Sequence, residues 1–186
     1  VDSVLRQIHG TDFYEARDTK HGPSMARLNV DLSVNDYDRN LFEVRKLVLE
    51  LRENEGMRHL VLKILAMALY FDRKLQVEPS MDDEERFEPD LLLRSDDYRP
   101  LLWVECGQCR VQKLDKVTFR HYDARVIMMK ATEREARDIA TRCKGEVRRI
   151  QAIEFVGFDP GFVEAVGETL TGRNDIIAII SGDDLQ

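Results

Sequence analysis

The sequence predicts an α/β protein with a mixed sheet flanked by helices. Three observations support this class. Apolar residues alternate over residues 26–34, they recur at helical spacing over 41–51 and 60–69, and short apolar runs alternate with helical patterns from residue 87 onward. This order of strands and helices is typical of a mixed sheet.

The first half of the chain predicts a strand, two helices and a short strand. Alternating leucines and valines define the strand over 26–34. Leucines and valines three and four residues apart predict a helix over 41–51, and Gly56 separates it from a second helix over 60–69. A short strand is expected over 75–79.

The second half predicts strands and helices in near-regular alternation. The expected elements are strands over 87–93 and 100–105, a helix over 110–121, a strand over 124–130, a helix over 132–144, a strand over 150–156, a helix over 160–168 and a buried strand over 176–180. The 186 residues suit one domain, which we place at 25–186. Residues 1–24 are polar and weakly patterned, so we interpret them as an N-terminal extension, either ordered or flexible.

The composition is that of an ordinary globular protein. The net charge is −7, so the surface as a whole does not attract nucleic acid, although a local basic patch is compatible with it. No apolar run approaches the ~20 residues of a membrane span, and the start lacks the apolar core of a secretory signal. Three cysteines do not make a disulfide framework. We therefore expect a cytoplasmic protein without a membrane partner.

Two carboxylates, Asp90 and Glu105, lie on neighbouring apolar runs. Asp90 follows Pro89 in the strand over 87–93, and Glu105 ends the strand over 100–105. Paired strands would bring the carboxylates together, where they repel unless a cation or proton lies between them. We expect them within about 6 Å of each other, sharing Mg²⁺ or Mn²⁺. The alternative is a salt bridge or a solvated strand end.

The helix after Glu105 carries Arg110, Lys113 and Lys116 at three-residue steps, on one side of the helix. A lysine from this side could reach the acidic pair and hold a nucleophilic water or a phosphate. The alternative is a solvated helix face.

Cys106 and Cys109 lie at the predicted strand-to-helix junction, where a helix N-terminus could activate a thiol for redox chemistry. With Cys143 and one histidine they could instead bind zinc, but the chain lacks a second ligand pair with zinc spacing. We expect reduced, metal-free cysteines. The four histidines considered for zinc are His9, His21, His59 and His121.

Taken together, four stretches resemble the YaeQ family, a divergent branch of the PD-(D/E)xK nuclease superfamily. They are Asp38-Arg39-Asn40-x-Phe42, Lys63-Ile64-Leu65-Ala66 followed by Leu69-Tyr70 and Leu75-Gln76-Val77, Glu88-Pro89-Asp90-Leu91, and Trp103-Val104-Glu105-x-Gly107 followed by Lys113-Leu114-x-Lys116. The likeness covers roughly residues 26–181 and rests on order and spacing together.

The resemblance implies a restriction-endonuclease-like core and a role for each site residue. Asp90 and Glu105 correspond to metal ligands for Mg²⁺ or Mn²⁺. Glu55, before the second predicted helix, matches an acidic position of the family, which the resemblance relates to the superfamily's first-helix glutamate. Lys113 or Lys116 would replace the superfamily lysine, because a glycine stands at its usual position. Arg58 departs from the pattern, since a second glutamate is expected there, and Cys106 and Cys109 are not hallmarks of the family.

The leading expectation is therefore a metal-dependent phosphodiesterase with nucleic acid as its partner. The first alternative is a non-catalytic interaction or regulatory protein that keeps the nuclease fold and binds a protein partner. A weaker alternative is a thiol oxidoreductase using Cys106 and Cys109. No sequence feature indicates an oligomeric state.

Overall fold

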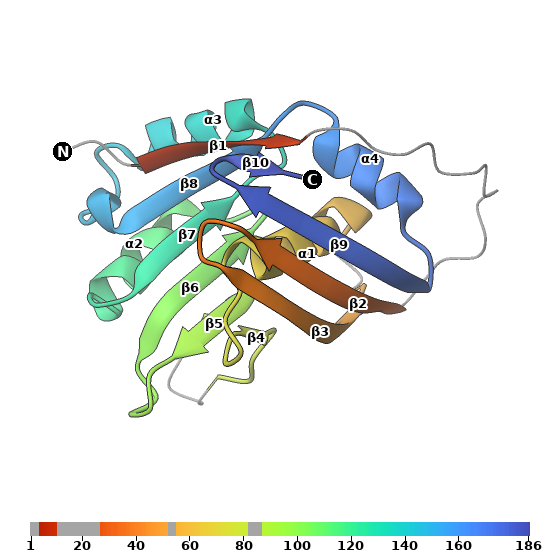
Figure 1. Cartoon of the computed structure of the whole chain (residues 1–186). Coiled ribbons are helices and arrows are strands. Elements are labelled where there is room, and N and C mark those ends of the chain that lie inside the picture. Colours follow the sequence, from red (N-terminus) through yellow and green to blue (C-terminus); the bar gives the residue numbers. More distant parts are fainter. Residues whose placement is uncertain (1–3, 11–26, 52–54, 82–86) are drawn as a thin grey trace.

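The computed structural model describes residues 4–10, 27–51, 55–81 and 87–186. These residues form a mixed sheet of ten strands with four α-helices (Figure 1). The strand order across the sheet is β3-β2-β9-β10-β1-β8-β7-β6-β5-β4. The strands are β1 (Val4–Gly10), β2 (Arg27–Asp36), β3 (Leu41–Glu50), β4 (Gln76–Val77), β5 (Leu91–Arg94), β6 (Pro100–Cys106), β7 (Arg125–Met129), β8 (Ile153–Phe158), β9 (Arg173–Ser181) and β10 (Asp184–Leu185).

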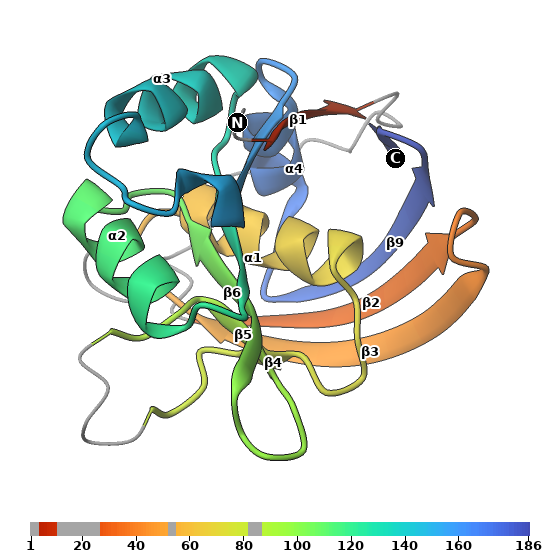
Figure 2. The same ribbon diagram turned by 90° about the vertical axis from the view of Figure 1, so that its left-hand side faces the viewer.

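The helices divide between the two faces of the sheet. Figure 2 shows α1 on the inner side of the curved strands β2, β3 and β9, and α4 packs against α1. Helix α3 packs on β8 and β1, on the opposite face of the sheet, and α2 contacts α3 on that face. The helices are α1 (Met57–Leu69), α2 (Val111–Arg120), α3 (Glu133–Cys143) and α4 (Phe162–Thr169). No helix among the described residues is long and apolar enough to span a membrane.

Strands β6, β7 and β8 are buried on both faces, because alternate side chains enter two different cores. Val104 and Ile127 join the core around α1. Trp103, Met128 and Phe155 join the core beneath α2 and α3. This alternation decides which helix each side chain of β6 meets, and so it organises the site described below.

One predicted helix is wrong. Residues 41–50 of the helix predicted over 41–51 form β3, which pairs antiparallel with β2 from Arg27↔Glu50 to Asp36↔Leu41. Its leucines and valines fit helical spacing, but their side chains point alternately to the two faces of the sheet. Leu47 and Leu49 are buried, and Val48 between them is exposed. The tight connection after β2 brings the next residues straight back along that strand, so tertiary pairing overrides the helical pattern.

The remaining predicted elements agree with the structure in kind, with two larger differences at their starts. Residues 87–90 of the strand predicted over 87–93 lie before β5, and residues 150–152 of the strand predicted over 150–156 form a 3-10 helix before β8. The N-terminal segment differs, because β1 lies inside the sheet between β10 and β8. Ile8 of β1 is fully buried. Residues 4–10 of the predicted extension therefore belong to the sheet, and residues 11–24 lie outside the described part of the chain.

Candidate functional site

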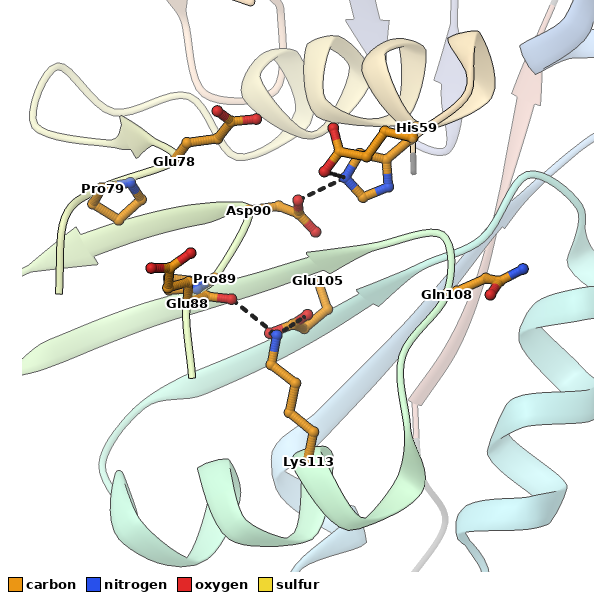
Figure 3. A pocket seen from close by; sticks show the side chains of 10 residues that line it. His59, Glu78, Pro79, Glu88, Pro89, Asp90, Glu105, Gln108 and Lys113 are labelled. Atoms are coloured by element: carbon orange, nitrogen blue, oxygen red, sulfur yellow. Dashed lines mark hydrogen bonds and ion pairs between the residues drawn. The ribbon is translucent and has the colours of Figure 1, made fainter. Parts of the chain in front are cut away.

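A polar cavity of about 200 Å³ lies where α1, the segment before β5, the end of β6 and the start of α2 meet (Figure 3). Its walls contain more acidic than basic side chains, so it is suited to bind a cation. The lining residues are Glu55, His59, Glu78, Pro79, Glu88, Pro89, Asp90, Glu105, Gln108 and Lys113.

Asp90 is fixed just before β5 by its own backbone and by both carboxylate oxygens. Its N–H donates to the carbonyl of Val104 (3.0 Å), which ties it to β6. Oδ2 accepts a hydrogen bond from the Cys106 N–H (2.7 Å), and Oδ1 lies 2.7 Å from His59 Nε2. Burial favours the neutral acid, but the bond from His59 and the Lys63 ammonium outweigh it and lower the pKa of Asp90.

Glu55, just before α1, and His59, in the first turn of α1, lie next to Asp90. His59 Nε2 lies 3.4 Å from Glu55 Oε1. One ligand atom each from Glu55, His59 and Asp90 lies within 4.8 Å of the others. Two carboxylates and an imidazole at this spacing are a donor set for a divalent metal ion.

Lys63, one turn further along α1, lies beneath these acids and is only 1% exposed. Its Nζ is 2.5 Å from Glu78 Oε1, 3.1 Å from Glu55 Oε2 and 3.4 Å from Asp90 Oδ1. Burial disfavours the ammonium, but the hydrogen bond that Lys63 donates to Glu78 and the charge of Asp90 outweigh this effect and raise the pKa of Lys63. The lysine is therefore a permanent positive charge inside the acidic cluster.

Glu105 lies across the cavity and faces α2 (Figure 3). It shares the face of β6 with Trp103, whose indole N–H donates to Oε1 (2.7 Å). Lys113 Nζ lies 2.6 Å from Oε1 and 2.7 Å from Oε2, and it also donates to the carbonyl of Glu88 (2.9 Å). Burial raises the pKa of Glu105, although these donors favour its ionised form.

The two lysines of α2 lie in different surroundings. Lys113 lines the cavity, whereas the ammonium of Lys116 lies 5.8 Å from the centre of the Phe87 ring and Lys116 is not a lining residue. Of these two candidates, Lys113 is the one next to the acids.

The structure explains why residue 107 is a glycine. Its φ is +69°, and a Cβ there would lie 3.2 Å from His59 Nδ1. A side chain would therefore be strained and would press on the imidazole. Lys130, which follows β7, donates from Nζ to the Gly107 carbonyl (2.5 Å), and burial lowers its pKa.

Four predicted site residues thus line one cavity: Asp90, Glu105, Glu55 and Lys113. Within the described residues, the converging ligand atoms include Asp90 and Glu55 but not Glu105. A direct sharing of one ion by Asp90 and Glu105 stays a prediction.

The sequence reasoning missed three residues of the site. Lys63 could have been noticed as a charge inside an otherwise apolar helix face, which requires a buried acidic partner. Glu78 and His59 offered weaker signals. Glu78 precedes a proline, as Glu88 does at the other wall, and His59 was considered only as a zinc ligand.

The cysteines do not form a redox pair in the structure. All three are free thiols. Cys106 is fully buried, and burial raises its pKa well above the usual value and raises that of Cys109 to about 12. A catalytic thiol needs the opposite shift. Cys143 lies in the core beneath α3.

Comparisons with known proteins agree on one family. A solved YaeQ protein from Xanthomonas axonopodis pv. citri is 24% identical, with a TM-score of 0.64 over 85% of this chain and 87% of that one. The YaeQ protein of Pseudomonas syringae is 18% identical, with a TM-score of 0.69 over 87% of each chain. At these identities the likeness shows the fold.

Sequence similarity extends the comparison. An uncharacterised YaeQ protein of Salmonella typhi is 34% identical over 76 residues, a match that spans 41% of this chain and 41% of that protein. The family model described as "YaeQ protein" matches residues 24–186. The chain therefore belongs to the YaeQ family.

Proposed function

We propose that the protein is a divalent-metal-dependent phosphodiesterase that acts on nucleic acid, with a PD-(D/E)xK-type site on a restriction-endonuclease-like core. The observation that carries the proposal is the convergence of Glu55, His59 and Asp90 within 4.8 Å at one wall of a polar cavity. Lys113 at the opposite wall supplies the positive charge that a phosphate requires.

The donor set fits a divalent ion. Asp90 is ionised at neutral pH, because its pKa is lowered, and Glu55 adds a second carboxylate. Carboxylate oxygens suit Mg²⁺ and Mn²⁺, and the imidazole of His59 favours Mn²⁺ of the two. His59 would contribute a ring nitrogen with a free lone pair as the third ligand.

When bound, a divalent ion would lower the pKa of a water molecule and stabilise negative charge on the phosphorus centre. The protein's own groups supply the rest. Glu105 and the Glu88 carbonyl hold the Lys113 ammonium at the cavity, where it can contact a phosphate oxygen or orient the nucleophilic water. Glu105 is in this view either a further ligand or the group that positions Lys113.

The alternative is a non-catalytic interaction protein that retains the fold. Two features favour it. Lys63 and Lys113 already neutralise part of the acidic site, and the net charge of −7 opposes general binding of nucleic acid. A thiol oxidoreductase has no comparable support, because both Cys106 and Cys109 have raised pKa values.

A cleavage assay tests the proposal. Purified protein is incubated at low salt with single-stranded DNA, duplex DNA or RNA, in Mg²⁺, in Mn²⁺ and in chelator, because phosphate contacts weaken as salt rises. We expect metal-dependent cleavage that falls at least ~100-fold in Asp90→Ala and in Glu105→Ala. Lys113→Met should lose activity, whereas the matched Lys116→Met on the same helix should retain it.

The control for adventitious nuclease is the Asp90→Ala protein purified in parallel. If no substrate is cut in either metal, and calorimetry detects no Mg²⁺ or Mn²⁺ binding at millimolar concentration, the enzymatic proposal is wrong. The interaction protein would then be the better account.

A further inference from the structure

Lys63 places a positively charged side chain inside the acidic cluster. Its ammonium contacts three carboxylates, those of Glu55, Glu78 and Asp90, at 2.5–3.4 Å. The side chain comes from the middle of α1 and is almost completely buried. Its charge therefore stays at the core side of the cluster and cannot move away into solvent.

The charges around Lys63 leave room for one divalent ion. Three carboxylates contribute three negative charges, and the ammonium removes one. The remaining two match a single Mg²⁺ or Mn²⁺. Glu105 does not alter this balance, because Lys113 contacts both of its oxygens.

The backbone at Glu78 is consistent with a specific role for this contact. Glu78 has a φ of +45°, which is unusual for a residue with a side chain and has an energetic cost. Its N–H donates to the Asp90 carbonyl (2.8 Å), and its carboxylate makes the shortest of the three contacts with Lys63. The chain thus holds Glu78 against Lys63 at some conformational cost.

We propose that Lys63 acts as a tethered cation that restricts the acidic cavity to one divalent ion per chain. The proposal rests on the metal-dependent function proposed above and specifies its ion stoichiometry. Lys63 is in this role a positioning residue, since it acts through the three carboxylates and does not line the cavity.

Titration of the full chain with Mn²⁺, followed by the electron paramagnetic resonance signal of the free ion, tests this inference. The wild type should bind one Mn²⁺. Lys63→Gln leaves three carboxylate charges without the ammonium, so it should bind the first Mn²⁺ at least about tenfold tighter and a second Mn²⁺ more weakly. Lys63→Arg keeps the charge and should bind one, and Lys116→Gln, on the outer side of α2, should behave as the wild type.

Two further measurements guard against a folding defect. Glu78→Gln should weaken binding of the single ion by roughly tenfold or more, because it removes a negative charge next to Lys63. Lys63→Gln should show a lower melting temperature than the wild type in chelator and a larger rise on adding Mn²⁺, since ions then replace the lost ammonium.

The outcomes separate this inference from the proposed function. Two ions bound to the wild type would overturn the role of Lys63 while supporting a metal enzyme. One ion in both wild type and Lys63→Gln, at equal affinity, would also overturn it. No ion in the wild type would contradict the metal-dependent function and the one-ion stoichiometry together. One ion gained in Lys63→Gln would in that case show that Lys63 replaces the metal, which also overturns the inference as stated.

Discussion

Substituting Gly107 with alanine should destabilise the protein through two separate effects. The φ of +69° is costly for a residue with a Cβ, by about 1–2 kcal/mol. The new Cβ would also lie 3.2 Å from His59 Nδ1, so the imidazole must shift by a few tenths of an ångström. This crowding should add about 1 kcal/mol, the lower end of the range for overpacking.

Gly145 offers a matched control for the backbone effect. Its φ is +87°, and a Cβ there would have no neighbour within 4 Å. Gly145→Ala should therefore show the conformational cost alone. In urea denaturation we expect Gly107→Ala to be less stable than Gly145→Ala by about 1 kcal/mol, with a melting temperature lower by roughly 2–4 °C.

Under the proposed PD-(D/E)xK relationship, the same comparison tests why a glycine stands where that motif has a lysine. Gly107→Lys restores the motif in sequence, yet it should be at least as destabilising as Gly107→Ala and should not raise cleavage activity. Equal stability of Gly107→Ala and Gly145→Ala would refute the close contact with His59, and a stable, more active Gly107→Lys would refute the steric explanation.

Three further predictions follow from the site. Lys113→Met should lower the melting temperature more than Lys116→Met, because only Lys113 pairs with a buried carboxylate; equal melting temperatures would contradict this. The folded-state pKa of Asp90 is lowered, so its stabilising contribution is present above its unfolded pKa of about 3.9 and lost as the pH falls through the folded value. Denaturation curves across acidic pH should therefore be less pH dependent in Asp90→Asn, and an unchanged slope would count against the assignment. A thiol reagent at neutral pH should modify Cys106 and Cys109 slowly in the native protein and fast in denaturant, whereas rapid native reaction would revive the redox interpretation.

Much of the fold could be predicted from the sequence because local periodicity matched tertiary burial. Helix α3 shows this, since Ala136 and Ile139 keep helical spacing and both are buried. Strand β3 shows the limit, because its spacing fits a helix and only pairing with β2 decides the matter. Strand β1 has few apolar residues, and its place beside β8 depends on a partner far along the chain.

In the site, too, contacts between neighbouring segments were predictable and contacts between distant segments were not. The meeting of Asp90 with the end of β6 was predictable, because β5 and β6 are consecutive antiparallel strands. The side chains brought in by α1 were not, since His59 is 31 residues from Asp90 and no local pattern encodes that contact. Lys63 carried a signal in its apolar surroundings, but its three partners come from three separate segments.

The central claim is that the cavity between α1 and β6 binds a catalytic divalent ion. Anomalous diffraction from a crystal soaked in millimolar Mn²⁺ tests it most directly. The account predicts a manganese peak bounded by oxygen atoms of Glu55 and Asp90 and a ring nitrogen of His59. A well-ordered cavity with no anomalous peak, or manganese only at other places on the surface, would contradict it.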